Sequence, residues 1–142
     1  MPVATLEHAN ITVTDLDQAL RFFAAAVPNW RLRGGGEMDW FGKTIQWRHV
    51  GHDDHYIALQ SGGQGPGPHW QTHATGVKHI GLAVGDIDAA VARLQDGGFA
   101  IDHWGAETPH RRSVYFMVGA DFQVELVQYL STDPALRNAY AA

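Results

Sequence analysis

The sequence predicts an α+β fold in which two βαβββ modules form an open, cavity-enclosing barrel of mixed β-sheet with the helices outside. The main observation is an internal repeat: residues 8–20 and 79–91 share one pattern at an offset of 71, half of the 142-residue chain. Each copy opens with a histidine, His8 or His79, and an aspartate then begins a helical pattern. A repeat of this kind sets the architecture of a chain. Three strand patterns follow each helix, so each half is predicted as βαβββ.

The first half begins with an alternating strand at Leu6–Val13. Asp15 follows as an N-cap, with Gln18 at capping-box spacing. Apolar residues then recur at helical spacing until Pro28, which stops the helix. The three strands after this helix are expected near Trp30–Arg33, Thr44–Val50 and His55–Gln60.

The second half repeats the strand at Val77–Val84, and Asp86 caps its helix. Gly97 and Gly98 are expected to end that helix, because helices often end at a residue with positive φ and glycine adopts that conformation readily. The strands that follow are expected near Ala100–Trp104, Ser113–Val118 and Phe122–Leu130. We therefore expect a single domain over residues 1–142, with a first module at about 5–60, a Gly/Pro-rich linker at 61–75, a second module at about 76–130 and a tail at 131–142.

Composition excludes several classes of protein. A net charge of −5 provides no basic surface for nucleic acid, and no partner of that kind is expected. The chain has no 18-residue apolar run and no signal-peptide pattern, so we expect a cytoplasmic protein with no membrane partner. It has no cysteine, which excludes thiolate metal sites, but it has nine histidines, and two of them carry the repeat.

The last predicted strand has one polar face and one apolar face. Its apolar residues should pack on the helix, which turns Glu125 toward the same side as His79. Matching the last strands of the two halves at an offset of 67 places Ala58 opposite Glu125 and Arg48 opposite Tyr115. The cavity is thus predicted to hold His8, His79 and Glu125, and its fourth quasi-symmetric position is an alanine.

Two imidazoles and one carboxylate form a ligand set that leaves metal positions open for water or substrate. A Lewis acid with open positions can polarise a carbonyl, epoxide or catecholate oxygen. The residues alone leave another interpretation open, in which His8 and His79 are packed strand histidines and Glu125 faces solvent.

Residues 6–13 followed by Asp15, and residues 77–84 followed by Asp86, resemble the strand-to-helix signatures of the vicinal oxygen chelate superfamily. That superfamily includes glyoxalase I, the bleomycin and fosfomycin resistance proteins and the extradiol dioxygenases. The resemblance covers about residues 5–130. It implies paired βαβββ modules, a homodimer, and a divalent metal (Fe, Mn, Zn, Ni or Co) held by His8, His79 and Glu125.

The departures from these relatives guide the functional expectation. Glyoxalase I normally has a carboxylate where Ala58 stands, so the set with three protein ligands looks more like fosfomycin-modifying enzymes or extradiol dioxygenases. Tyr115, ten residues before Glu125, also resembles those two groups, although their Asp-Pro-x-Gly turn is replaced by residues 118–121. We expect Tyr115 to donate a hydrogen bond or proton and Arg48 to orient an anionic group. For each of them, an ordinary packed or exposed strand residue is the alternative.

Two functions remain open from the sequence. The first is a metal-dependent enzyme that acts on a small oxygen-bearing molecule, of dioxygenase or fosfomycin-resistance type. The second is a metal-free protein of bleomycin-resistance type that sequesters a small molecule. Four further histidines have no partner that the sequence can name: His69, His73, His103 and His110.

Overall fold

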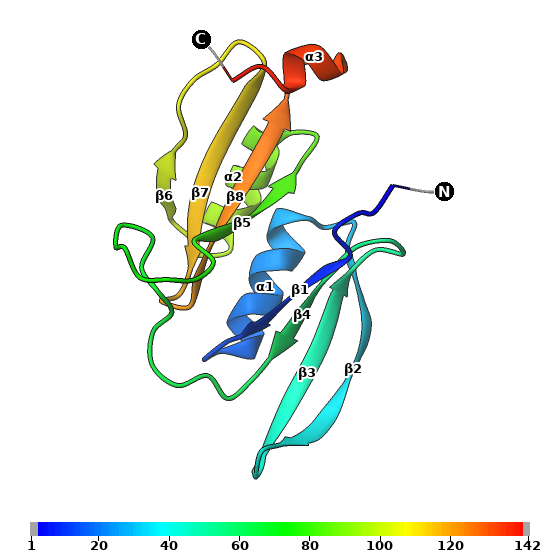
Figure 1. Ribbon diagram of the computed structural model, residues 1–142, viewed down its shortest axis with the longest axis vertical. Helices are drawn as coiled ribbons and strands as arrows, with labels where there is room; N and C mark the ends of the chain where they lie inside the picture. The colour runs from blue at the N-terminus through cyan, green and yellow to red at the C-terminus, as the bar shows by residue number, and fades with distance from the viewer. Residues whose placement is uncertain (1–2, 141–142) are drawn as a thin grey trace. The chain divides into compact units, whose positions relative to one another are not determined.

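The computed structural model describes residues 3–140. The chain forms two compact units, residues 1–65 and 66–142. Residues 1–2 and the last two residues of the predicted tail 131–142 lie outside the described part. Each unit is built from one four-stranded mixed sheet and one long helix (Figure 1).

The first unit follows the predicted order of elements. They are β1 (His8–Thr12), α1 (Leu16–Ala26), β2 (Arg31–Trp40), β3 (Lys43–Gly51) and β4 (Tyr56–Gln60). The sheet order is β1-β4-β3-β2, with β1 parallel to β4 and the other pairs antiparallel.

The second unit repeats this topology. Its elements are β5 (His79–Ala83), α2 (Ile87–Asp96), β6 (Ile101–Trp104), β7 (Arg111–Val118) and β8 (Phe122–Tyr129), and a short α3 (Pro134–Arg137) follows in the tail. The sheet order is β5-β8-β7-β6, again with the first and last strands parallel. Two βαβββ modules of the α+β class are therefore confirmed.

Both long helices begin at the predicted caps. The side chain of Asp15 accepts a hydrogen bond from the backbone N–H of Gln18 at 2.9 Å, and Asp86 accepts one from Ala89 at 3.0 Å. Helix α2 ends at Gly97, and Gly98 follows with φ +89°, a conformation that favours glycine.

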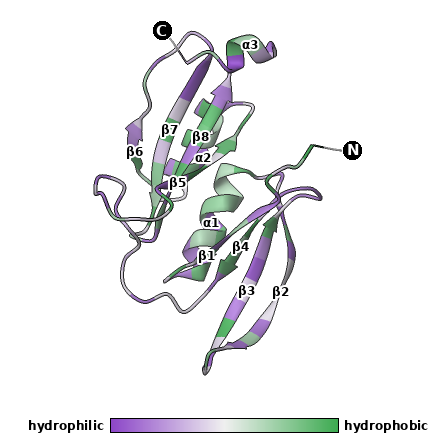
Figure 2. Cartoon of the chain, viewed as in Figure 1, coloured by the Kyte–Doolittle hydropathy of each residue, from purple (hydrophilic) through white to green (hydrophobic). Residues whose placement is uncertain are grey.

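Each sheet buries the face that lies toward its helix. Along β7 and β8, fully buried apolar residues alternate with partly exposed ones, and α2 contacts both strands. The fully buried set is Val114, Phe116, Val118, Val124 and Leu126. Figure 2 shows the mixture of hydrophobic and hydrophilic residues along β3 and β8. The period of two assigns every second side chain to the opposite face of the sheet.

The strand predicted as Trp30–Arg33 is in fact β2, which runs to Trp40 and pairs along its length with β3. Glycines at 34–36 are poor strand formers, but the ladder with β3 outweighs that local preference. A two-residue turn joins the strands, with Phe41 at φ 48° and Gly42 at φ 85°, close to a type I′ hairpin turn. Among the described residues, no helix is long and apolar enough to cross a membrane.

Replacing Phe116 with alanine should lower the free energy of unfolding by about 3–5 kcal/mol, because its fully buried ring leaves a cavity beneath α2. Replacing Phe41 with alanine removes the same group from a site that is 93% exposed and should cost about 0.5 kcal/mol or less. Urea denaturation of both variants measures the difference. Equal losses would contradict the burial pattern.

Candidate functional site

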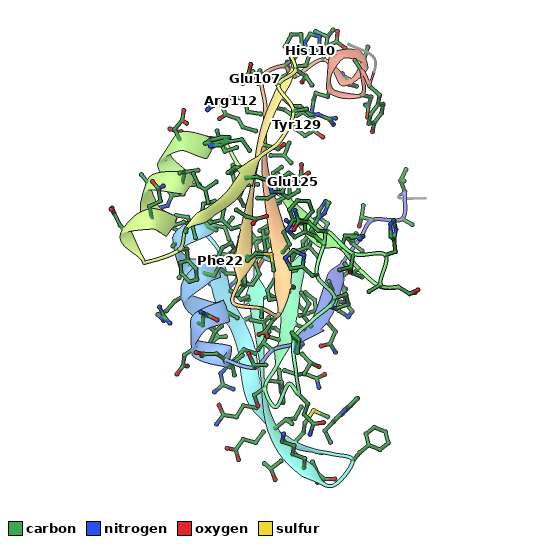
Figure 3. All side chains as sticks on the ribbon, turned by 90° about the vertical axis from the view of Figure 1, so that its left-hand side faces the viewer. Phe22, Glu107, His110, Arg112, Glu125 and Tyr129 are labelled. Atoms are coloured by element: carbon green, nitrogen blue, oxygen red, sulfur yellow. The ribbon has the colours of Figure 1, made fainter. Side chains whose placement is uncertain are left out.

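The second unit brings His79 and Glu125 together on the open face of its sheet. Glu125 lies in the middle of β8, and its register partner on the parallel strand β5 is Gly81, two residues after His79 (Figure 3). The His79 Nε2 atom lies 3.1 Å from the Glu125 Oε2 atom. Their side chains are 34% and 19% exposed, so the pair is sheltered but reachable from solvent.

Tyr115 completes this cluster from β7. It pairs in register with Glu125, and its ring meets the His79 ring edge to face at a centroid distance of 5.3 Å. Burial raises the pKa of Tyr115, and the negative charge of Glu125 and the hydrogen bond to that carboxylate raise it further. The phenol is therefore a neutral hydrogen-bond donor at ordinary pH.

The pair fits the chemistry of a divalent metal. Imidazole nitrogen and carboxylate oxygen bind such ions at about 2.0–2.2 Å, so two adjacent ligand atoms lie roughly 3.0–3.4 Å apart. The distance of 3.1 Å between His79 Nε2 and Glu125 Oε2 lies in that range. The partners are of the nitrogen and oxygen types that first-row divalent ions prefer.

The first unit presents His8 at the equivalent strand position. Its Nδ1 atom lies 2.9 Å from Glu7 Oε1, and its ring stacks on Tyr56 at 4.8 Å with an interplanar angle of 9°. A carboxylate at Nδ1 favours the tautomer that has its proton on that nitrogen. Residue 58 pairs with Asn10 as Glu125 pairs with Gly81, so the predicted match of Ala58 with Glu125 is correct.

The match of Arg48 with Tyr115 was wrong by one residue. His49 pairs with Ala58 as Tyr115 pairs with Glu125, because Ala58 lies nine positions after His49 along the chain, whereas Glu125 lies ten positions after Tyr115. Arg48 pairs instead with the buried Leu59, on the helix-side face, and donates hydrogen bonds to backbone carbonyls, the closest at 2.8 Å.

In the first unit, His49 thus occupies the position that corresponds to Tyr115 in the second unit. Its ring stacks on Tyr56 at 4.6 Å and meets Trp47 at 4.9 Å. Burial lowers the pKa of His49, and the positive charges of Arg33 and His8 lower it further. The first unit therefore presents stacked aromatic rings next to His8, with the Arg33 guanidinium over the Tyr56 ring at 4.2 Å.

The two units contribute different parts of the predicted ligand set. His8 lies in the first unit, whereas His79 and Glu125 lie in the second. Among residues 3–140, no group of three His, Cys, Asp or Glu side chains is placed to hold a metal ion. The set of His8, His79 and Glu125 stays a prediction; within the second unit, His79 Nε2 and Glu125 Oε2 lie 3.1 Å apart.

A hollow of about 470 Å³ lies in the second unit, between the end of β6 and the start of β7. Arg111 and Ser113, which share the face of Tyr115 by alternation along β7, form part of its wall, together with Trp104 and Leu130. Figure 3 places Arg112 and Tyr129 at this end of the sheet and Glu125 nearer its middle. The volume is within the range of small-molecule sites, about 300–1,000 Å³.

The remaining arginine of this region has a structural partner. Arg112 lies at the start of β7 and makes two hydrogen bonds to the Asp88 carboxylate, at 2.8 and 3.0 Å. Its guanidinium also lies over the Trp104 ring at 5.3 Å. This arginine joins the sheet to α2 and is not a free anion-binding group.

The duplicated βαβββ topology and the histidine on each first strand define a protein of the paired-module class. The chain belongs to the Glyoxalase/Bleomycin resistance protein/Dioxygenase superfamily, whose family profile matches residues 7–116. The resemblance to the vicinal oxygen chelate superfamily is thereby confirmed. No protein of curated function matches the chain.

Solved structures share the fold at low sequence identity. A glyoxylase/bleomycin resistance protein/dioxygenase domain from a Frankia species is 20% identical, with a TM-score of 0.71 over 93% of this chain and 96% of that one. The fosfomycin resistance protein FosX from Mesorhizobium loti is 18% identical, with a TM-score of 0.64 over 92% and 94%. A FosX variant from Listeria monocytogenes, complexed with Mn(II) and dihydroxypropylphosphonic acid, is 17% identical, with a TM-score of 0.66 over 92% and 95%.

Sequence reasoning missed the surroundings of these side chains. His103 has no partner in the sequence pattern, yet its ring stacks on Tyr115 at 4.3 Å and on Trp70 at 4.5 Å. The stacking on Tyr115 could have been anticipated only from the register of β6 with β7. The stacking on Trp70 depends on a loop, whose path no periodic pattern describes.

Replacing Glu125 with glutamine should lower the pKa of Tyr115 toward its ordinary value of about 10, because the carboxylate charge that opposes ionisation is removed. Tyrosine labelled at Cζ, titrated by NMR in metal-free protein, reports this shift directly. The same titration in the Glu37→Gln variant, which alters a carboxylate on β2, should leave the Tyr115 resonance unchanged. An unshifted pKa in Glu125→Gln would mean that the two groups do not interact.

Proposed function

We propose that this protein is a divalent-metal-dependent enzyme that acts on a small oxygen-bearing substrate. His8, His79 and Glu125 are the metal ligands, and Tyr115 is the hydrogen-bond or proton donor beside them. The observation that carries the proposal is the pairing of His79 with Glu125 at 3.1 Å, with Tyr115 in register with Glu125 and its ring against that of His79. Membership of a superfamily that includes enzymes agrees with it.

The reaction type follows from the three proposed protein ligands and from the alanine, Ala58, at the matching fourth position. When bound, a divalent ion would supply Lewis acidity to a carbonyl, epoxide or catecholate oxygen. Ala58 stands where a fourth protein ligand would be and cannot coordinate, so one direction is left to the substrate. This arrangement favours chemistry of fosfomycin-resistance or dioxygenase type over that of typical glyoxalase I.

The roles of the chain's own residues differ by position. His79 and Glu125 hold their nitrogen and oxygen atoms at ligand spacing before any ion arrives, which reduces the cost of ordering the site. Tyr115, neutral and half-buried, can orient a substrate oxygen by donating its phenolic proton in a hydrogen bond. Arg48 is left out of the proposal, because its guanidinium is bound to backbone carbonyls on the helix-side face.

The substrate is expected to be small and rich in oxygen. The hollow of about 470 Å³ beside Arg111 and Ser113 has mixed polar and apolar walls and suits a compact molecule. The Mn(II) and dihydroxypropylphosphonic acid of the Listeria FosX structure are such an ion and such a ligand in a protein of this fold. A homodimer also belongs to the proposal and rests on the family resemblance.

Replacing His79 with alanine should abolish binding of Mn²⁺, Co²⁺ or Zn²⁺, since two remaining ligands hold a divalent ion poorly. Replacing the exposed His73 with alanine is the matched control and should leave the affinity unchanged. Wild-type affinity should fall by roughly 100-fold or more from pH 7 to pH 5, because imidazole binds metal only when neutral and its ordinary pKa is about 6.5.

Titration calorimetry at both pH values measures these effects. Unchanged binding in His79→Ala, or equal wild-type affinity at the two pH values, would mean that the histidines are not the ligands. If purified and metal-loaded wild-type protein both bind no ion, the metal-dependent function is wrong and a metal-free binding protein replaces it.

A further inference from the structure

The edge strand β2 of the first unit contains a β-bulge, and the extra residue of this bulge is Arg33. The register of β2 against β3 shifts between Leu32 and Gly34, and Arg33 between them has no partner on β3. A bulge bends its strand and re-aims a side chain, and bulges are frequent at sheet edges and next to functional sites. The direction that Arg33 takes is therefore set by the bulge and not by regular alternation.

The Arg33 guanidinium lies on the open face of the sheet, next to the proposed metal ligand of this unit. Its Cζ atom is 4.2 Å from the centroid of the Tyr56 ring. Tyr56 pairs in register with His8, and the rings of these two residues stack at 4.8 Å. One tyrosine thus contacts both a cation and the proposed metal ligand, so a single small molecule can reach both groups.

Within the described part of the chain, the charge of Arg33 has no ion-pair partner. The carboxylate of Asp53 is bound to Arg31 instead. The hydrogen bond and the charge of Arg31 lower the pKa of Asp53 most, and the charge of Arg33 lowers it less. Arg33 is exposed, and its planar fork of N–H donors matches the oxygen atoms of a carboxylate or a phosphonate.

The second unit has a bulge at the equivalent position, but the protein itself binds the charge there. The register of β6 against β7 shifts between Ile101 and His103, and Asp102 is the extra residue. Asp102 accepts a hydrogen bond from Gln123 Nε2 at 3.1 Å and lies 2.8 Å from His103 Nδ1. Both units therefore have a charged residue at the bulge, and the charge of Arg33 is the one left for a ligand.

A glycine leaves room for a ligand beside Arg33. Gly34 follows the bulge and corresponds in register to His103 of the second unit. A side chain at Gly34 would begin 3.9 Å from the Trp47 ring, its nearest neighbour across the strands. The side-chain layer of the first unit therefore has a gap next to the guanidinium, at the place where the second unit has an imidazole.

Arg48, the arginine that the sequence favours for an anionic group, is enclosed on the other face. Its Cδ atom lies so close to Gly35 that a Cβ atom there would be 2.7 Å away. Its guanidinium donates hydrogen bonds to the carbonyls of Trp47 and Gly36, at 2.8 and 3.4 Å. Arg33 has the exposure and the position on the open face that Arg48 lacks.

We propose that Arg33 binds the anionic group, a carboxylate or a phosphonate, of the small molecule on which this protein acts, and thereby determines its specificity. The inference rests on the proposed function for the other end of that molecule, whose oxygen atoms are the part that reacts beside His8. No covalent bond changes in this role. The N–H donors of the guanidinium bind the oxygen atoms of the anion, and the Tyr56 ring supports the guanidinium on one side.

The test compares two probes of nearly the same shape, succinic acid monohydroxamate and the corresponding amide. Both have a hydroxamate, which chelates divalent ions, at one end, and the other end is a carboxylate in the first probe and a neutral amide in the second. Titration calorimetry of the Mn²⁺-loaded full chain should show that the carboxylate probe binds about tenfold more tightly or better, because hydrogen bonds between charged groups are the stronger ones. In Arg33→Met, this preference should fall to about twofold or less.

Two further variants separate anion binding from a structural role. Arg31→Met is the matched control, because this arginine of the same strand is paired with Asp53, and the preference should stay at the wild-type value. Arg33→Lys has the charge without the planar fork and should retain part of the preference. A purely structural contact of Arg33 with Tyr56 would alter thermal melting but not the ratio of the two affinities. Circular dichroism verifies that each variant is folded.

The outcomes separate this inference from the proposed function. If Mn²⁺ binds but wild type shows no preference, binds neither probe, or has a preference that persists in Arg33→Met, the role of Arg33 is refuted and the metal site stands. If wild type binds no Mn²⁺, the proposed function fails, and the metal-free protein is titrated with the same probes. A preference for the carboxylate probe that Arg33→Met removes then supports the anion site alone, and the absence of such a preference refutes it.

Discussion

The burial of one apolar sheet face under one amphipathic helix is the constraint on which each unit depends. In the second unit, Phe116 and Leu126 are fully buried on the face that α2 covers, and strand alternation then assigns Tyr115 and Glu125 to the other face. A shift of the pairing by one residue would expose the core and bury the carboxylate, so the core enforces the register. The polar face is therefore positioned by apolar packing, not by its own contacts.

Duplication supplied two such faces, and the two have diverged in chemistry. The second face has Glu125 and Tyr115 beside its histidine, whereas the first has Ala58 and His49 at the matching positions. In the first unit, His8 contacts Glu7 and stacks on Tyr56. In the second unit, His79 contacts Glu125 directly. One unit thus presents a carboxylate and a phenol beside its histidine, and the other presents an imidazole stacked on a tyrosine ring.

The structural features that could be predicted from the sequence are those governed by periodicity. The repeat around His8 and His79 identified both modules, and alternation along β8 placed Glu125 on the histidine side of its sheet. Hairpin length has no periodic signal, and the hairpin from His49 to Ala58 is one residue shorter than that from Tyr115 to Glu125, which displaced Arg48 from its expected match. The position of Asp102 beside His103 depends on a register irregularity, which only the ladder itself defines.

Pulsed electron paramagnetic resonance of the Mn²⁺-loaded protein tests whether both modules contribute a histidine to one metal site, because it counts the imidazole nitrogens coupled to the ion. We expect two coupled imidazoles in wild type and one in His8→Ala, with the remaining coupling assigned to His79 by labelling. A wild-type spectrum with no imidazole coupling, or with two that persist in His8→Ala, would contradict a metal site made from one histidine of each module.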